Sequence, residues 1–399
     1  MARLSSQARV MTHYGNQINP RTKREREPDQ TVTVGAMDYT IYLVVVILVL
    51  IGVVMVFSAS YVQASNDQGD AFYYLRRNGI MALLGFVVMN VVAQVNYEHI
   101  RRFAPIIFLI ALGLMVAVEV IGIASHGATR WIPFPIIGQF QPSEVAKAAV
   151  IFMIAFMVDK APNGLQTWKG LFIYSGVVGL ITLFVLRSGF SSGLIVGAIG
   201  FGMIFIASPH ILRFIMAGVA GVSAIVGYLW WDANFSDGFR GRRFSAWFDP
   251  WAYSDSIGYQ VIQSLYAIGS GGLFGHGIGQ SRQATFVPEA HHDIIFAIAV
   301  EELGFIGAAL ILLLFGVFIW RGINVALKAH NNFTAMTAIG VVLAIGLQAL
   351  INIAVVTNSI PNTGVTLPFI SYGGTSLVVS MALVGVLLNI SKHTKVRDR

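Results

Sequence analysis

The stretch Ile41-Tyr-Leu-Val-Val-Val-Ile-Leu-Val-Leu-Ile-Gly-Val-Val-Met-Val-Phe57 contains no charged residue, and it decides the class of fold. A helix needs about 20 predominantly apolar residues to cross the hydrocarbon core of a bilayer. The apolar run, taken as 38–62, is long enough for this, and no small-residue cleavage site follows it. It therefore predicts a membrane anchor that stays in the protein, and not a signal peptide that is removed.

The rest of the chain has the same apolar character. Apolar residues make up 56% of the sequence and charged residues only 11%, whereas ordinary soluble domains carry about a quarter charged residues. This composition predicts an all-α polytopic membrane protein. The formal charge of +7 does not indicate nucleic-acid binding, because the basic residues lie at the ends of apolar runs, as topology signals do. The absence of cysteine excludes disulfides and thiolate metal sites.

The apolar runs predict about ten transmembrane helices. Most Lys and Arg residues fall in the tails and in short connections on one side, which places both termini in the cytoplasm. The polar stretch 231–292, between spans 7 and 8, is then a large extracellular loop. We expect residues 1–37 to be a disordered cytoplasmic tail, 38–391 the membrane domain, and 392–399 a second cytoplasmic tail. The expected spans are 38–62, 78–95, 103–123, 142–158, 168–186, 190–207, 211–230, 293–320, 333–357 and 369–391.

Several charged side chains lie within predicted spans, where burying an unpaired charge in the membrane costs free energy. In Gln141-Pro-Ser-Glu-Val-Ala-Lys147, Glu144 and Lys147 are three positions apart on one helix face, so they can pair. Such a pair is either a structural clamp between helices or a cation presented to an anionic lipid headgroup. Glu301 and Glu302 lie within a span and are functional candidates for the same reason, although one of them can simply satisfy a backbone or arginine partner.

Three further motifs each allow two interpretations. In His126-Gly-Ala-Thr-Arg-Trp-Ile132, the Trp can be an interfacial anchor, or the Arg and Trp together can bind a sugar phosphate. His291-His292-Asp293 resembles a metal cluster, but adjacent helical histidines diverge by about 100° and no third ligand is fixed, so no metal site is certain. The glycines of 269–279 either let backbone N–H groups approach a phosphate or allow close packing of a loop that dips into the membrane.

The stretch 240–260 is the densest collection of chemistry-bearing side chains. It holds three arginines, several aromatic rings, and carboxylates at Asp249 and Asp255. A single loop Asp is usually a turn or cap residue. The collection favours a site, because arginines suit a pyrophosphate, aromatic faces suit sugar rings, and a carboxylate suits proton abstraction.

With these motifs the chain resembles the SEDS family (shape, elongation, division and sporulation proteins) of bacterial cell-wall polymerases, over nearly all of 38–391. The resemblance is to the division and sporulation branch more than to the elongation branch. The motifs that carry it are Phe57-Ser-Ala-Ser60, Gly127-Ala-Thr-Arg-Trp-Ile132, Gln141-Pro-Ser-Glu144 with Lys147, Gly258-Tyr-Gln-Val-Ile-Gln-Ser264, Val287-Pro-Glu-Ala-His-His-Asp293 and, most strongly, Pro361-Asn-Thr-Gly-Val-Thr-Leu-Pro-Phe-Ile-Ser-Tyr-Gly-Gly-Thr-Ser376.

The resemblance implies a peptidoglycan glycosyltransferase that polymerises lipid II, an undecaprenyl-pyrophosphoryl disaccharide-pentapeptide. It implies a multi-pass protein of the bacterial cytoplasmic membrane, expected at the division septum. The implied partners are lipid II, a class B penicillin-binding protein transpeptidase, other membrane proteins of the divisome, and the bilayer itself, with no nucleic acid. It requires no cofactor and leaves room for a divalent cation, Mg²⁺ or Mn²⁺.

The resemblance also implies the roles of individual residues. The essential carboxylate of the family lies in the large outer loop, and we carry its role to Asp255, with Asp249 in reserve, because Tyr253 stands where many members have Asp. A second departure is Arg187-Ser-Gly-Phe-Ser-Ser192, where many members have Gln-Pro-Asp-Leu-Gly-Thr and no acid stands at Gly189. The expected substrate-binding residues are Arg130, Trp131, Glu144, Lys147, Arg243, Tyr259, His292 and Ser371.

A lipid II flippase is the competing class. Many spans, intramembrane charges and a set of cations that fits a pyrophosphate are compatible with it. Alternating access, however, places substrate contacts near the bilayer midplane. The charged groups of this sequence are expected to cluster on the outer side, which favours the enzyme.

Overall fold

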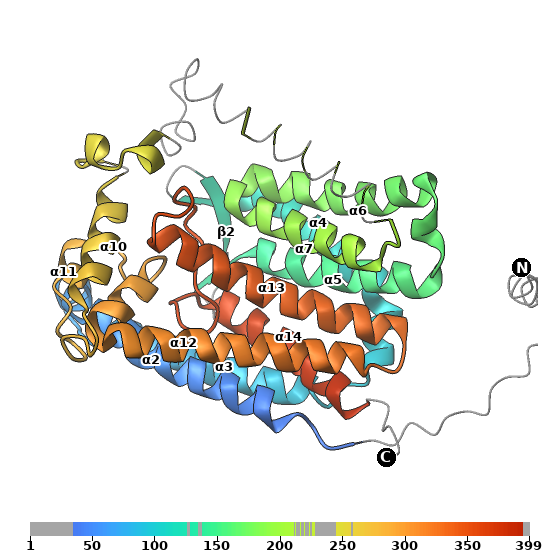
Figure 1. Cartoon of the computed structure of the whole chain (residues 1–399), viewed down its shortest axis with the longest axis horizontal. Coiled ribbons are helices and arrows are strands. Elements are labelled where there is room, and N and C mark those ends of the chain that lie inside the picture. The colour runs from blue at the N-terminus through green and yellow to red at the C-terminus, as the bar shows by residue number, and fades with distance from the viewer. Residues whose placement is uncertain are drawn as a thin grey trace, which may run out of the picture.

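The computed structural model describes residues 35–125, 128–134, 138–210, 245–256 and 258–393, with scattered positions between 212 and 227. These residues form an elongated helical bundle whose long helices run roughly side by side (Figure 1). The long helices are α2 (Tyr39–Gln68), α3 (Tyr73–Val92), α4 (Tyr97–Ile121), α5 (Pro142–Lys160), α6 (Trp168–Ser188), α7 (Phe190–Ala207), α12 (Ile295–Leu327), α13 (Asn332–Val356) and α14 (Thr375–Lys392). Shorter elements are β1 (Ile123–Ser125), β2 (Ala128–Phe134), β3 (Gly138–Phe140), α10 (Tyr259–Ser270), α11 (Gln283–Phe286) and two 3₁₀ turns at Gly164–Gln166 and Trp251–Tyr253.

The helices confirm the predicted all-α polytopic membrane fold. Within the described residues, eight helices are long and apolar enough to cross a membrane: α2, α3, α4, α6, α7, α12, α13 and α14. A ninth predicted span, 142–158, is α5, which carries four charged side chains and packs against α4, α7 and α13. The predicted span 211–230 lies mostly outside the residues that the structure describes.

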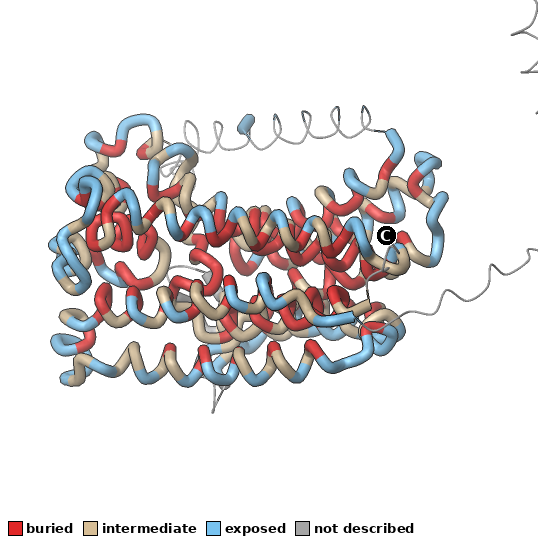
Figure 2. Tube along the Cα trace, turned by 60° about the horizontal axis from the view of Figure 1, so that its bottom comes forward, coloured by how far each residue is buried: buried red, intermediate tan, exposed pale blue. Residues whose placement is uncertain are grey.

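The centre of the bundle is formed by α5, α13 and α14. Buried residues run through the middle of the bundle, and exposed ones lie on its outward sides (Figure 2). The apolar stretch of α14 is 78% buried and that of α6 only 22%. Outward-facing leucines such as Leu43, Leu83 and Leu109 are more than half exposed, as expected for side chains that contact lipid.

Small residues allow the helices to approach closely. A Cβ atom at Gly385 of α14 would lie 2.5 Å from the carbonyl oxygen of Met89 in α3, and one at Gly85 of α3 would lie 2.5 Å from the sulfur of Met381. Because lipid tails are as apolar as leucine, helices in a membrane associate through such van der Waals contact and not through exclusion of water. Glycine at these two positions therefore sets the distance between α3 and α14.

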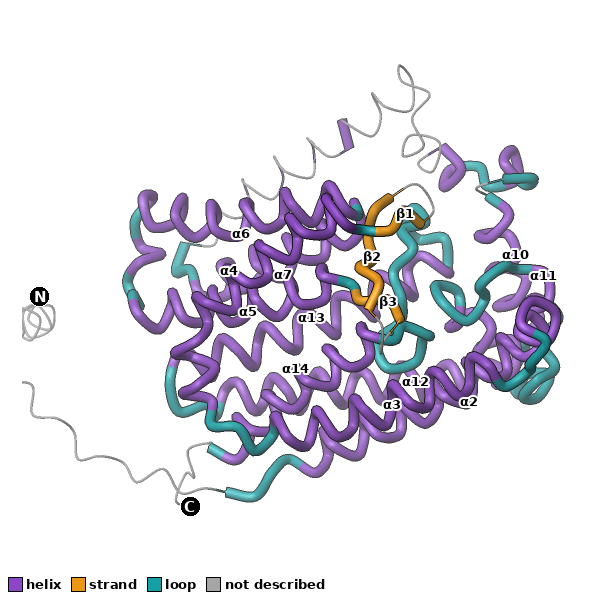
Figure 3. The backbone as a smooth tube through the Cα atoms, turned by 180° about the vertical axis from the view of Figure 1, so that it is seen from behind, coloured by secondary structure: helices purple, strands orange, loops and turns teal. Residues whose placement is uncertain are grey.

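One end of the bundle carries β1–β3, α10, α11 and the segment 357–374, and we call it the sheet end (left in Figure 1). The three strands form an antiparallel sheet of order β1-β2-β3, which lies where the sequence predicted only a loop (Figure 3). The sheet end corresponds to the predicted extracellular side. It also contains the described part of the large loop 231–292, in which α10 is the longest helix.

The two ends of the described chain meet at the opposite end of the bundle. The amide of Gly35 donates to the carbonyl oxygen of Lys392 over 2.7 Å, so the segment before α2 lies against the end of α14. Asp38 caps α2 by accepting hydrogen bonds from the amides of Thr40 and Ile41, and its carboxylate forms an ion pair of 2.7 Å with Arg321 of α12. The described residues nearest to the two termini therefore lie at the same end of the bundle, as the charge pattern predicted.

Candidate active site

At the sheet end, a buried charged pair opens α5. Pro142 occupies the first turn of the helix, where a missing N–H costs nothing, and Glu144 and Lys147 follow on one face. The Nζ atom of Lys147 lies 2.8 Å from Oε2 of Glu144, close enough for an ion pair although not aligned as a hydrogen bond. Both residues are only 6% exposed. Two charges so far from water are stable only while each keeps its partner.

The pair continues as a chain of hydrogen bonds into α13. The ammonium of Lys147 donates to Oε1 of Gln348 over 2.7 Å, and Nε2 of Gln348 donates to the carbonyl oxygen of Thr366 over 3.1 Å. The chain joins α5, α13 and the segment 357–374. This chain of hydrogen bonds acts as a structural clamp between helices, one of the two interpretations of the Glu144–Lys147 motif. It also holds the ammonium group of Lys147 at the sheet end.

The segment 357–374 is folded by its own polar side chains. The hydroxyl of Ser371 accepts a hydrogen bond from the amide of Leu367 over 2.8 Å, and it is buried. The amide group of Asn352 donates to the carbonyl oxygens of Val365 and Asp293, over 2.6 and 2.7 Å. These bonds fix the segment between α13 and the residues that precede α12. The predicted binding residue Ser371 therefore has a partner within the protein.

His291 and His292 lie in an aromatic cluster with Tyr74 and Tyr372. The ring centroid of His291 is 4.3 Å from that of Tyr74 and 5.3 Å from that of Tyr372, and the centroids of His292 and Tyr372 are 5.1 Å apart. Burial, and secondarily the neighbouring His292, lower the pKa of His291 to about 3, so its ring is neutral. Burial raises the pKa of Tyr372 to about 12. Within the described residues, no three His, Asp or Glu side chains gather closely enough to hold a metal ion.

The helix α12 is broken at Gly304. Its φ of 69° and ψ of −171° are outside the range that side-chain-bearing residues adopt, and the break divides the span into two helices. The glycine-rich segment 271–277 fills the break: His276 and Gly277 donate their amides to the carbonyl oxygens of Glu301 and Glu302, and Phe305 donates to Gly272. All three bonds are 2.9–3.0 Å long. Of the two interpretations of 269–279, the structure shows the close packing.

The side chains of Glu301 and Glu302 anchor the loop 279–282, which follows the glycine-rich segment. Oε2 of Glu301 accepts a 2.5 Å hydrogen bond from the hydroxyl of Ser281, and its Oε1 accepts from the amide of Arg282 over 3.0 Å. Glu302 accepts from the hydroxyl of Ser58 in α2 over 2.6 Å. Ser58 in turn accepts from the amide of Gly279 over 2.8 Å. Both carboxylates therefore serve to fix the 279–282 loop against α2 and α12.

The two candidate bases stand on an exposed turn. Oδ1 of Asp249 accepts a hydrogen bond from the amide of Ala252 over 3.2 Å, so this carboxylate is bonded to the 3₁₀ turn at Trp251–Tyr253. Asp255 follows in the next turn and is exposed. Neither acid has an ion-pair partner among the residues that the structure describes. The structure thus does not bring Asp249 or Asp255 into contact with the buried Glu144–Lys147 pair.

Aromatic and amide side chains attach this turn to the sheet end. The indole Nε1 of Trp247 donates to the carbonyl oxygen of Asn358 over 2.9 Å, which ties the turn to the end of α13. The hydroxyl of Tyr259 donates to the carbonyl oxygen of Phe286 over 3.3 Å, and Nδ2 of Asn362 donates to Oε1 of Gln260 over 3.0 Å. The predicted binding residue Tyr259 therefore connects the first residue of α10 to the end of α11. Arg243 lies outside the described residues.

Arg130 and Trp131 lie next to each other on β2. Trp131 pairs with Ile123 of β1 in the sheet, and both predicted residues are partly buried. The Nε atom of Arg130 is buried and has no hydrogen-bond partner among the described residues. β2 contacts α4, α5 and α6, so Arg130 lies at the same end of the bundle as Glu144 and Lys147.

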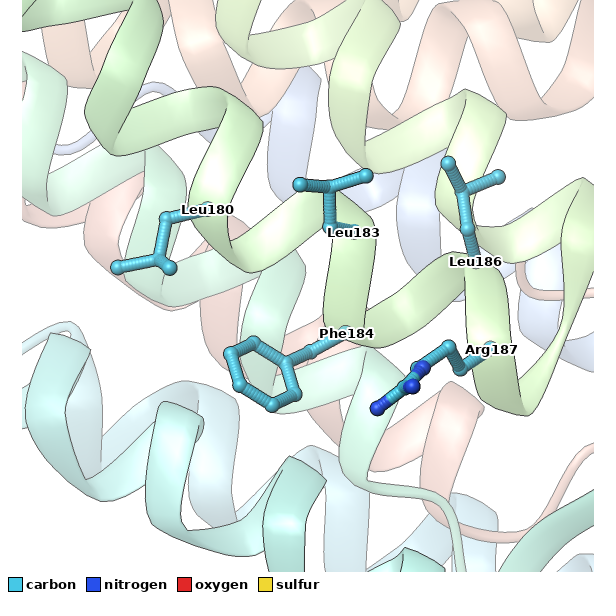
Figure 4. Close-up of a pocket in the computed structure, with 5 residues that line it drawn as sticks. All are labelled: Leu180, Leu183, Phe184, Leu186 and Arg187. Atoms are coloured by element: carbon cyan, nitrogen blue, oxygen red, sulfur yellow. The ribbon is translucent and has the colours of Figure 1, made fainter.

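An apolar pocket of about 500 Å³ opens on the outward side of α6 (Figure 4). Its walls include Leu180, Leu183, Phe184 and Leu186, and Arg187 lies at its sheet end. The guanidinium of Arg187 is 3.6 Å from the carboxylate of Glu119 in α4. An apolar surface that ends in a cation has the chemistry to hold a lipid chain with an anionic headgroup.

Two contributors to the sheet end were missed from the sequence. Ser58 belongs to the quoted motif Phe57–Ser60, but nothing in the motif indicated that its partner was Glu302, 244 positions away. Gln348 stands in the middle of an otherwise apolar span, and a buried amide in that position is itself a signal of a partner in the bundle. That signal was available in the sequence.

Comparison with known proteins extends over almost the whole chain. A family model described as "Cell cycle protein", covering FtsW, RodA and SpoVE, matches residues 38–396. "Stage V sporulation protein E" of Bacillus subtilis is 39% identical over 365 residues, which cover 90% of this chain and 98% of that protein. "Probable peptidoglycan glycosyltransferase FtsW" of Geobacter sp. strain M18 is 39% identical and covers 91% of this chain and 98% of its own.

Solved structures share the fold. The chain superimposes with a TM-score of 0.71, at 24% identity, on a chain from "Structural coordination of polymerization and crosslinking by a peptidoglycan synthase complex", covering 89% of this chain and 98% of the other. It superimposes on the rod shape determining protein RodA of Thermus thermophilus with a TM-score of 0.65 at 23% identity, covering 91% and 99%. The chain therefore belongs to the FtsW, RodA and SpoVE family of cell cycle proteins.

Proposed function

We propose that the chain is a peptidoglycan glycosyltransferase that polymerises lipid II into glycan strands during cell division. Relatives at 39% identity that bear the name peptidoglycan glycosyltransferase support the enzyme class. The observation that carries the proposal is the position of the polar groups. The Glu144–Lys147 pair, Arg130, the His291 cluster and both loop acids all belong to the sheet end of the bundle, and none lies at its middle.

The proposed reaction transfers a glycan between two lipid-linked substrates. The 4-hydroxyl of the acceptor sugar attacks C1 of the donor sugar, a new C1–O bond forms, and the bond from C1 to the pyrophosphate oxygen breaks. The hydroxyl proton goes to a carboxylate, for which we propose Asp255 with Asp249 in reserve. The pyrophosphate is a good leaving group and needs cations more than an acid, a role for Arg130, Arg243 and Lys147.

In-line attack inverts the anomeric centre. A retaining mechanism needs a second carboxylate close enough to form a covalent sugar intermediate. Trp131, Tyr259, His292 and Ser371 are the proposed contacts to the sugars. A divalent ion, Mg²⁺ or Mn²⁺, can assist the departing pyrophosphate if the substrate brings it.

We propose that a class B penicillin-binding protein works beside the chain as transpeptidase at the division septum, with other divisome membrane proteins. A solved structure with this fold comes from a complex described as coordinating polymerization and crosslinking, and we carry such a partner to this chain as part of the proposal. The apolar pocket on α6 supports a lipid-linked substrate, since a polyprenyl chain needs a surface open to the bilayer.

The competing function is a lipid II flippase. The two are separated by giving the purified chain, with a class B transpeptidase in lipid vesicles, fluorescent lipid II on one side of the membrane. Polymerisation predicts long glycan products that a muramidase digests, in vesicles where lipid II has not changed leaflet. Movement of lipid II to the other leaflet without any glycan product contradicts the proposal and supports the flippase.

A further inference from the structure

The large outer loop contains a long stretch without charge. Residues 256–281 include no Asp, Glu, Lys or Arg. The glycine-rich segment 271–277 lies within this stretch, and its two large apolar side chains, Leu273 and Phe274, are 63% and 79% exposed. The neighbouring Ile278 is exposed as well. Large apolar side chains gathered on a surface mark a place of contact, so this part of the loop needs an occupant other than water.

Helix α12 measures how deep this segment lies in the membrane. Its exposed Trp320 precedes Arg321, which pairs with Asp38 at the end of the bundle opposite to the sheet end. An interfacial Trp beside a charged pair marks the inner edge of the hydrocarbon core. The helical stretch from Arg321 back to Phe305 is about 24 Å long at ~1.5 Å per residue, whereas the hydrocarbon core is about 30 Å thick. Phe305 therefore lies about 6 Å inside the outer edge, and any tilt of α12 places it deeper.

Helix α2 gives the same depth independently. It begins after its N-cap Asp38, and Ser58 follows about 30 Å further along the helix, which is level with the outer edge of the hydrocarbon core. The hydroxyl of Ser58 accepts a hydrogen bond from the amide of Gly279 over 2.8 Å, so the residue just after the glycine-rich segment lies at that edge. The segment itself is bonded to α12 at Phe305, through the carbonyl oxygen of Gly272. Between Gly279 and Gly272 the chain therefore descends below the outer edge.

The backbone of the segment meets the requirement of this depth. An unpaired N–H or C=O group is costly in hydrocarbon, so irregular backbone lies there only where it is packed against protein. The amide of Ile306 donates to the carbonyl oxygen of Leu273 over 3.2 Å, and the amide of Gly275 donates to that of Gly271 over 2.9 Å, in addition to the bonds across the break in α12. A Cβ atom on Gly275 would collide with the carbonyl oxygen of Glu302, so the backbone is pressed onto α12. The polar backbone thus bonds to the protein, while the large apolar side chains stay exposed.

We propose that Leu273 and Phe274 insert among the acyl chains of the outer leaflet and anchor the large loop to the bilayer. Acyl chains are the occupant because the exposed surface continues onto Phe305 and Ile306 of the same spanning helix, which are exposed too. The segment follows α10, and α10 follows the turn that carries Asp255, so the anchor holds this acid close to the membrane surface. The value of that position for catalysis rests on the proposed function. Insertion does not, and it is measured without lipid II, so the two can fail separately.

Single cysteines test the insertion, since the chain contains no cysteine of its own. Leu273→Cys and Phe274→Cys are each labelled with an environment-sensitive fluorophore, and the full-length protein is placed in nanodiscs of neutral phosphatidylcholine. Quenching is measured with iodide in the water and with lipids that carry a nitroxide on the acyl chain. Ser254→Cys, in the exposed turn of the same loop, is the matched control for water, and Leu313→Cys, exposed on α12, is the control for lipid. The series is repeated with a purified class B transpeptidase present.

We expect iodide to quench the labels at 273 and 274 at least threefold less than the label at 254. Nitroxide lipids should quench them at least threefold more than the label at 254, and a nitroxide near the headgroup should be more effective than one at the chain end. The label at 313 should show the reverse preference, because it lies deeper. Iodide quenching at both 273 and 274 equal to that at 254 overturns the insertion. Protection that appears only with the transpeptidase overturns it too, and assigns the surface to that partner.

Discussion

At the scale of single residues, the sheet end is held by charges that depend on one another. Lys147 has two partners, the carboxylate of Glu144 and the amide oxygen of Gln348, and all three residues are buried. An ion pair of this kind contributes little compared with an apolar pair of similar volume, but breaking it leaves one charge alone. The pair is therefore best tested by changing one member and then both.

We predict that Lys147→Met destabilises the protein by about 3–5 kcal/mol, because Glu144 is left as an unpaired buried charge. The double variant Glu144→Leu with Lys147→Met should recover a large part of that loss. Thermal unfolding in detergent measures both. Lys328→Met, at an exposed position after α12, is the control and should change little. A double variant no more stable than Lys147→Met would contradict the description of Glu144 and Lys147 as a coupled pair.

The shifted pKa of His291 predicts how the stability of the folded protein depends on pH. Its pKa is about 3 in the folded protein, below the ordinary value of 6.5, so the folded state binds fewer protons than the unfolded state between these values. The contribution of the neutral ring is fully present above pH 6.5 and is lost as the pH falls toward 3, by up to ~1.4 kcal/mol for each pH unit.

We therefore expect the melting temperature to fall as the pH is lowered from 7 to 5. His291→Phe keeps an aromatic ring in the cluster with Tyr74 and Tyr372 but does not titrate, so it should flatten this part of the profile. Identical pH profiles for His291→Phe and the unchanged protein would show that His291 is not the titrating group.

At the scale of elements, the broken helix α12 shows most clearly how a single glycine allows a backbone conformation that other residues do not. A Cβ atom on Gly304 would lie 2.4 Å from both the amide nitrogen of Gly275 and the carbonyl oxygen of Leu273. These are backbone atoms of the segment that fills the break, so they cannot move aside as a side chain can. The φ of 69° adds strain for any residue other than glycine.

We predict that Gly304→Ala destabilises the protein by more than about 2 kcal/mol, because strain and collision act together. Gly316→Ala lies in the same helix, with nothing within 4 Å of its Cβ position, and should be neutral or slightly stabilising. Thermal unfolding and limited proteolysis of 271–283 measure both variants. Equal stability of the two variants would mean that α12 does not need its break.

The sequence predicted the elements of this protein better than their details. A long apolar run in a membrane forms a helix, because a helix satisfies all of the run's backbone hydrogen bonds within the segment itself. Nearly every described span therefore lies where it was expected. The sheet β1–β3 and the break at Gly304 were not predicted. The strands are short and polar residues interrupt them, and a single glycine in an apolar run has no periodicity that distinguishes a break from close packing.

The site was predicted as a set of residues but not as an arrangement. The pairing of Glu144 with Lys147 followed from their spacing, since three positions on a helix define one face. The contacts of Ser58 and Gln348 depend on segments far apart in the chain, and no local pattern gives them. For the loop acids the sequence suggested chemistry, whereas the structure shows Asp249 bonded to the amide of Ala252 in the turn that follows it and Asp255 as an exposed turn residue.

At the scale of the whole molecule, the predicted orientation places the sheet end outside the cell and both termini inside. The chain contains no cysteine, so single cysteines can report this directly. Ser254 is exposed at the sheet end, and Asn163 is exposed in the connection between α5 and α6 at the other end.

We predict that Ser254→Cys reacts with a membrane-impermeant maleimide in intact cells without an outer membrane, such as spheroplasts. Asn163→Cys should react only after the membrane has been permeabilised. The unchanged chain is the control for background labelling. Labelling of Asn163→Cys alone in intact cells would reverse the orientation and place the sheet end in the cytoplasm.

The central claim is that an acid of the large loop takes the proton of the acceptor hydroxyl at the sheet end. Its most direct test is the rate of lipid II polymerisation by the purified chain with its transpeptidase partner, in Asp255→Asn and Asp249→Asn, with Asp67→Asn at the exposed end of α2 as the matched control. The account predicts that one loop variant, Asp255→Asn first, loses about a hundredfold or more while the control keeps its rate. Full activity in both loop variants would contradict it.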